Sequence, residues 1–143
     1  MDKINFINGS QPAINDTNLN KLQTNIENAI NGTVLYESEA GSKDEITLSE
    51  TVLNYKRIKM FYHYSNYYAS VEVDNANNKM IPLSVAFSIT EFNLSRIQYK
   101  DVKISGNKIT NTGYGYLSIS TAGTYGVSIE ENAIYIDKII GYK

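Results

Sequence analysis

The hydrophobic period of this chain changes once, near residue 33, and that change constrains the fold more than any other feature. Over residues 14–32, apolar side chains recur at steps of three and four, which is typical of a helix with one apolar stripe. From Thr33 onward, apolar and polar residues alternate in short runs separated by turn residues, with no further helical pattern. The sequence therefore predicts a mainly β protein, with a short N-terminal helix followed by an antiparallel β-sandwich or jelly-roll head.

The predicted helix carries a single apolar stripe with the spacing of the a and d positions of a coiled coil. Its members are Leu19, Leu22, Ile26, Ala29 and Ile30. Asn15, Asp16 and Thr17 are candidate N-caps, and Gly32 can end the helix in the left-handed conformation. A helix of about 15 residues is marginal by itself in water. We therefore expect the stripe to pack either on the β region or on copies of itself.

The clearest strand pattern covers residues 81–89, with Pro82 near its start, where a missing donor is tolerated. The alternation breaks between Tyr99 and Val102, which predicts a bulge or bend near Lys100 and Asp101. The other predicted strands are 33–37, 45–49, 57–64, 68–74, 96–104, 108–112, 114–120, 125–130 and 133–142. A turn is expected at 38–43, and residues 50–55 have room for one helical turn.

Composition and charge exclude several classes of function. The net charge is only −2, with the two signs interspersed, so neither a nucleic-acid groove nor an acidic-membrane footprint is expected. The chain has no cysteine, so it has no disulfide and no thiolate metal site. The first residues contain no long apolar run, so we expect no signal peptide and no membrane-spanning helix. We divide the chain into an arm and helix, 1–32, and a head domain, 33–143.

The residues that could perform catalysis are sparse. His63 is the only histidine, and no serine or threonine lies in a nucleophile-elbow sequence. Residues 74–78 look like a calcium loop but lack its glycine and its final glutamate, so a plain turn is favoured. Glu72 and Asp74 are candidates for the paired acids of glycoside hydrolysis, because they would lie about 7 Å apart on one strand face. Alternating acids are common on solvated strands, however, so we do not assign them this role. We expect no enzyme activity, no catalytic residue, no metal site and no cofactor.

Tyrosine is the most suggestive residue type in this chain. Flat rings with a polar tip can stack on sugars and accept hydrogen bonds from hydroxyl groups. Tyr is also favoured half-buried between strands or subunits, and for any single Tyr this is the favoured interpretation. The candidate ligand-binding residues are Tyr62, His63, Tyr64, Tyr67, Tyr68, Tyr114 and Tyr116.

Both ends of the chain resemble a family of phage proteins. Residues 6–21, FINGSQPAINDTNLNK, are similar to the N-terminal segment of tail, baseplate and fibre proteins from phages of Gram-positive bacteria. Residues 134–143, IYIDKIIGYK, resemble the last strand of head domains in the same proteins.

This resemblance implies a non-enzymatic virion protein, assembled in the bacterial cytoplasm, that forms a homotrimer. Its N-terminal arm would bind other virion proteins, and its head would act as a receptor-binding domain for host cell-wall polysaccharide. Three identical weak sites would gain strength through avidity. The alternative is a purely structural fibre, head-fibre, decoration or connector protein without a receptor site.

Overall fold

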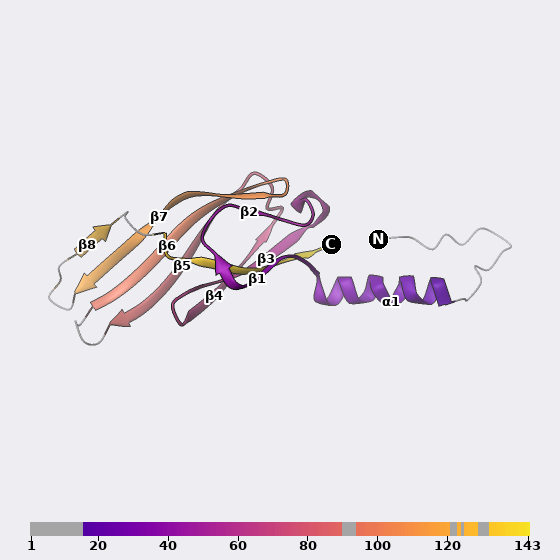
Figure 1. Ribbon diagram of the computed structural model, residues 1–143, viewed down its shortest axis with the longest axis horizontal. Coiled ribbons are helices and arrows are strands. Elements are labelled where there is room, and N and C mark those ends of the chain that lie inside the picture. Colours follow the sequence, from indigo (N-terminus) through magenta and orange to yellow (C-terminus); the bar gives the residue numbers. More distant parts are fainter. Residues whose placement is uncertain (1–15, 90–93, 121–122, 124, 129–131) are drawn as a thin grey trace.

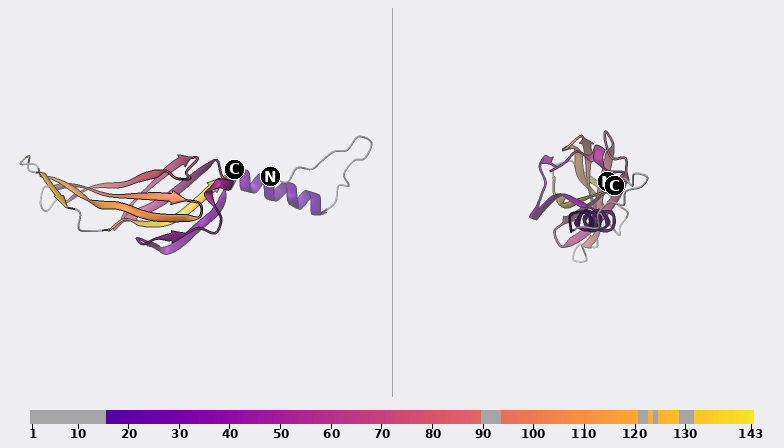
Figure 2. Two further views of the ribbon diagram at one scale, coloured as in Figure 1. Left: turned by 90° about the horizontal axis from the view of Figure 1, so that it is seen from above. Right: turned by 90° about the vertical axis from the view of Figure 1, so that its right-hand side faces the viewer.

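The computed structural model describes residues 16–89, 94–120, 123, 125–128 and 132–143. The molecule is elongated, with a helix at one end and a β head at the other (Figure 1, Figure 2). The mainly β class with one short N-terminal helix is confirmed. The predicted arm and the candidate N-cap Asn15 lie outside the described residues. In the described part of the chain, no helix is long and apolar enough to span a membrane.

The helix α1 covers Asp16–Asn31 and ends at Gly32, as the sequence predicts. Gly32 has a φ of +71°, the left-handed conformation that glycine adopts without steric cost. A Cβ at this position would contact Ile140 and would lie 2.9 Å from the carbonyl oxygen of Gly141. The end of the helix therefore fits closely against the last strand of the head.

Two antiparallel sheets form the head. The four-stranded sheet has the order β1-β9-β3-β4, and the five-stranded sheet has the order β2-β7-β6-β5, with β8 pairing with β7 as well. The strands are β1 Thr33–Ser42, β2 Ile46–Thr47, β3 Arg57–Tyr64, β4 Tyr67–Asp74, β5 Met80–Ile89, β6 Leu94–Ser105, β7 Lys108–Ser120, β8 Tyr125–Ser128 and β9 Tyr135–Tyr142. Between β2 and β3, the 3-10 helix η1, Val52–Asn54, is the helical turn for which the sequence has room.

Two expected boundaries within strands are wrong. Residues 38–43 were expected to form a turn, but β1 continues to Ser42 and stays beside β9, with an irregularity between the pairs Glu37↔Lys138 and Ser42↔Ile136. The runs 108–112 and 114–120 form one 13-residue strand, β7. The register between β6 and β7 shifts at Asp101/Val102, so an irregularity lies at the predicted position. The additional residue is on β7, however, and β6 itself does not bulge there as expected.

The core lies between the two sheets. Inward-facing residues of both sheets form one buried cluster, and the alternation predicted for β3 and β5 is confirmed. The main core residues are Leu35, Ile58, Met60, Tyr62, Ile81, Leu83, Val85, Val102, Ile104, Ile109, Ile136 and Ile139. Every buried hydrophobic residue of the described chain lies between Leu35 and Ile139, so α1 adds nothing to this core.

The distal half of β6, away from the helix, departs from the expected alternation. Gln98 and Lys100 face inward and are at most 1% exposed, whereas Ile97 is 37% exposed on the opposite face. The reason lies in the bulge: the additional residue, Thr112, is on β7, so β6 keeps one face inward along its whole length. Apolar residues therefore point outward in this part of the sheet.

Lys100 is a buried cation held by backbone carbonyl groups. Its Nζ donates to the carbonyl oxygen of Lys43 at 2.8 Å and to that of Ile134 at 3.2 Å. Burial lowers the pKa of Lys100 from 10.5 to about 8, and the nearby carboxylate of Asp44 opposes the decrease. Lys100 thus ties the segment after β1 to the segment before β9.

Candidate ligand groove and oligomerisation surface

The helix α1 projects from the head along the long axis of the molecule (Figure 1, Figure 2). Leu19, Leu22 and Ile26 are 52%, 48% and 50% exposed, and Ile30 is 71% exposed. The helix contacts the head near its C-terminal end, beside β9 (Figure 1). The stripe therefore does not pack on its own β region in the single chain, which is one of the two arrangements that the sequence allows.

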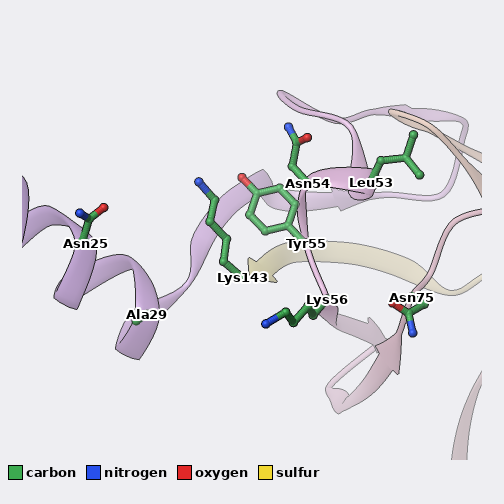
Figure 3. Close-up of a pocket in the computed structure, with 8 residues that line it drawn as sticks. All are labelled: Asn25, Ala29, Leu53, Asn54, Tyr55, Lys56, Asn75 and Lys143. Atoms are coloured by element: carbon green, nitrogen blue, oxygen red, sulfur yellow. The ribbon is translucent and has the colours of Figure 1, made fainter. Parts of the chain in front are cut away.

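A hollow of about 540 Å³ lies where the helix meets the head (Figure 3). Asn25 and Ala29 line it from the helix, and Leu53 and Tyr55 line it from the base of the head. The Tyr55 ring packs against Gly141, where an added Cβ would lie 2.6 Å from its Cγ atom. Tyr55 donates its hydroxyl proton to Glu50 Oε2 at 2.9 Å, and burial raises the pKa of this phenol. Ala29 therefore lies where the apolar stripe of the helix meets the open surface of the head.

Strand alternation divides the predicted tyrosine cluster between two faces of the β3–β4 hairpin. Tyr62 is a core residue, 5% exposed, with its hydroxyl 3.4 Å from the backbone of Ser84 on the other sheet. Its prediction as a ligand-contacting residue is wrong, because alternation turns it inward. Tyr64 and Tyr67 stack on Phe87 with centroid distances of 4.9 and 5.0 Å, so they close one end of the core.

The opposite face of the hairpin holds an open groove, which we call the outer groove. It has a volume of about 810 Å³ and lies on the outer side of the four-stranded sheet. The residues that line it are Glu37, Ser38, Glu39, Phe61, His63, Tyr68, Asp137, Lys138 and Ile140. Of the predicted ligand-binding residues, the structure places His63 and Tyr68 here.

His63 lies between two tyrosine rings. Its ring centroid is 5.3 Å from that of Tyr135, in a stacked arrangement, and 5.3 Å from that of Tyr68, in a tilted one. The Tyr68 residue is 76% exposed, so most of its ring faces solvent. Together these three rings form an aromatic cluster on adjacent strands, because His63 on β3 pairs with Tyr68 on β4 and with Tyr135 on β9.

Asp137 reaches this cluster through a bulge in β9. It is the additional residue between the pairs Tyr62↔Ile136 and Phe61↔Lys138, and bulges of this kind re-aim a side chain. Its Oδ1 lies 2.7 Å from His63 Nδ1. A Cβ on Gly41 would lie 2.7 Å from Asp137 Oδ1, so only glycine fits where β1 passes over the pair. The His–Asp pair is therefore held in one orientation.

The outer groove is lined by charged side chains as well as aromatic rings. A second pair, Lys138 Nζ with Glu37 Oε1 at 2.8 Å, adds a cation and a carboxylate to its wall. Among the residues that the structure describes, His63 makes no hydrogen bond to a hydroxyl group, and no three His, Cys, Asp or Glu residues come together as a metal site. Aromatic rings flanked by carboxylates are suited to a polyol, whose C–H faces stack and whose hydroxyl groups donate.

Tyr114 and Tyr116 lie elsewhere, on β7 of the five-stranded sheet. The guanidinium of Arg96 lies 4.1 Å from the Tyr116 ring centroid, and its Nε donates to Ser118 Oγ at 3.2 Å. Tyr114 is 39% exposed. Neither residue lines the outer groove. The predicted ligand residues thus divide among the core, the outer groove and a separate sheet.

The two residues that contact His63 from β9, Tyr135 and Asp137, are not among the predicted ligand-binding residues. Their positions two apart in the last strand give a weak signal that they share a face. The pairing of β9 with β3 is what makes them relevant, and this pairing joins positions 74 residues apart. Local periodicity contains no information about such a pairing.

Comparisons with known protein families, with curated proteins and with solved structures found no match for this chain.

Proposed function

We propose that this chain is a non-enzymatic virion protein of a phage that infects Gram-positive bacteria, and that it works as a homotrimeric receptor-binding fibre. The resemblance at both ends of the chain motivates the class of protein. The observation that carries the trimer is the uncovered stripe of α1, in which Leu22 and Ile26 are each about half exposed in the single chain. A stripe with a/d spacing that its own head does not cover is satisfied when parallel copies pack together.

The helix would serve as the stalk and the β head as the part that meets the host. Parallel packing places three heads at one end of the stalk, because α1 continues the long axis of the head (Figure 2). Each head would present one outer groove with Tyr68 at its rim. In this proposal the ligand is a cell-wall polysaccharide, bound weakly at each site and held by three sites together.

Charged residues in the stripe test the stalk. We expect Leu22→Asp combined with Ile26→Asp to convert the trimer to a monomer, because three pairs of carboxylates would be buried in the seam. Light scattering after size exclusion measures the mass directly. Asn20→Asp combined with Gln23→Asp is the matched control, since it adds the same charge at polar positions of the same helix. An unchanged mass in the stripe variant would contradict the stalk.

A second experiment tests the outer groove. We expect Tyr68→Ala to remove most binding to a panel of Gram-positive cell-wall polysaccharides while the trimer remains intact, because the exposed ring supplies the stacking surface. Tyr114→Ala removes a tyrosine from the other sheet and is the comparison variant. Loss of binding in Tyr114→Ala with full binding in Tyr68→Ala would move the site to β7.

The second candidate is a structural fibre or connector without a receptor site. It shares the trimeric stalk, so the mass measurement does not separate the two. Absence of binding by the intact trimer to every polysaccharide in the panel would favour it.

A further inference from the structure

An apolar row crosses the outer face of the five-stranded sheet in its distal half. Strand pairing aligns Ala86 with Ile97, Ile97 with Leu117, and Leu117 with Val127, so the row spans β5, β6, β7 and β8. Alternation places it on the face opposite the buried Val85 and Gln98. We call this set the distal row.

The distal row is exposed in the single chain. Val127 is 71% exposed and Ile97 is 37% exposed, as is Ile119, the next outward residue along β7. The inward neighbours are polar, since Gln98, Arg96 and Ser118 lie on the other side of the same strands. On β6 and β7 the usual rule, apolar inside and polar outside, is thus reversed, whereas β5 keeps it. Such a reversal is typical of a sheet with a partner on its outer face.

The chemistry of the row identifies the partner. Around it, the outward residues are Ser84, Ser88, Ser95, Tyr99 and Ile119, and none of these described positions carries a charge. A nucleic acid, a charged polysaccharide or an acidic peptide would find no counter-charge among these outward residues, since the charged residues of the same face of β6, Asp101 and Lys103, lie toward the helix end of the strand. An equally uncharged face fits it, and charge depletion at an apolar centre is characteristic of interfaces between copies of one chain.

Position along the molecule supports the same partner. The row lies near the β8 end of the head, and α1 extends from the opposite end (Figure 1, Figure 2). Copies joined in parallel through α1 have their distal ends at the same height. We propose that the distal row Ala86–Ile97–Leu117–Val127 packs against the neighbouring head in the homotrimer, which makes it a second interface remote from the stalk. This inference rests on the proposed trimer.

The absence of tryptophan from the chain permits a direct test. Val127→Trp places one fluorophore in the row, and its high exposure in the single chain leaves room for the larger side chain. We expect the emission of the full-length trimer to lie at shorter wavelength, and to be quenched less by acrylamide, than that of the same variant carrying Leu22→Asp and Ile26→Asp. Light scattering on both samples establishes the mass.

Met80→Trp is the matched control, because Met80 is 63% exposed on β5 but lies outside the row. Its emission should be the same in trimer and monomer. If the trimer forms and the Val127→Trp emission equals that of the monomer, or if Met80→Trp changes as much as Val127→Trp, the second interface is overturned while the stalk stands. If the full-length chain is itself a monomer, the stalk and this interface are both overturned.

Discussion

At the scale of the residue, one backbone carbonyl group connects the buried Lys100 to two other segments of the chain. Lys43 presents one carbonyl oxygen to three donors: Lys100 Nζ at 2.8 Å, Asn111 Nδ2 at 2.8 Å and Asn132 Nδ2 at 2.6 Å. This oxygen gathers segments that lie far apart in the sequence. A buried ammonium group held this way costs desolvation energy that its hydrogen bonds partly offset.

The buried Lys100 predicts a dependence of stability on pH. Its pKa in the folded protein, about 8, lies below the 10.5 of an ordinary lysine, so between these values the unfolded chain holds more protons than the folded one. The contribution of this group to the free energy of unfolding therefore increases as pH rises through that window. We expect the difference in unfolding free energy between the natural protein and Lys100→Met, measured in urea, to increase from pH 8 to pH 10.5.

The matched control for this titration is Lys103→Met, which removes an exposed lysine from the same strand. This variant measures the general effect of losing one positive charge on the free energy of unfolding. Its change with pH is subtracted from that of Lys100→Met before the two are compared. A difference for Lys100→Met that stays constant with pH would mean that the ammonium group is solvated in the folded state.

At the scale of the element, the end of α1 is a tightly packed junction. Gly32 combines a positive φ with close contact to Ile140 and Tyr142, whereas Gly123 has a φ of +77° and open space around it. Alanine substitutions at the two glycines therefore separate the cost of backbone strain, present at both, from the cost of steric overlap, present only at Gly32.

We expect Gly32→Ala to lower the free energy of unfolding by about 2 kcal/mol, because strain and overlap add. Gly123→Ala adds only the strain of a left-handed alanine, about 1 kcal/mol. Denaturant unfolding of both variants measures the difference. Equal losses would show that strand β9 yields to the new methyl group, which would contradict a rigid junction.

A strand and its pairing could be predicted from the sequence where apolar residues alternate regularly on one face and the paired strand follows directly along the chain. Ile58, Met60 and Tyr62 alternate along β3, and the two residues Ser65 and Asn66 close its hairpin with β4, so both strands and their pairing follow from local pattern. The inward Gln98 and Lys100 could not be predicted, because a bulge on the neighbouring strand sets the facing of β6. The same limit applies to the outer groove: the sequence predicts His63 as a ligand-binding residue, but Asp137 joins it only through the pairing of β3 with β9, 74 residues further along the chain.

At the scale of the whole molecule, the core of the head does not depend on the helix. All buried hydrophobic residues of the described chain lie in the proposed head domain, 33–143. This arrangement supports the division of the chain at residue 32, since a domain with its own core can fold alone.

We therefore expect a fragment of residues 33–143 to fold with the β-rich circular dichroism of the full chain and to unfold cooperatively. In the full chain, the melting temperature should rise with protein concentration, because association through the stalk stabilises only the folded state. The fragment should lose most of that concentration dependence. A fragment without a cooperative transition would contradict the domain division.

The junction of Gly32 with β9 also determines how a pull on the helix would reach the head. Tension on α1 enters β1, and β1 is joined to β9, which is joined in turn to β3, the strand that carries His63. The hydrogen bonds between antiparallel strands are perpendicular to the strands. Because β9 runs along the long axis (Figure 1), a pull in that direction would strain all bonds of the ladder together rather than one after another. If the proposed ligand held the head at its outer groove, the head would therefore resist being unzipped.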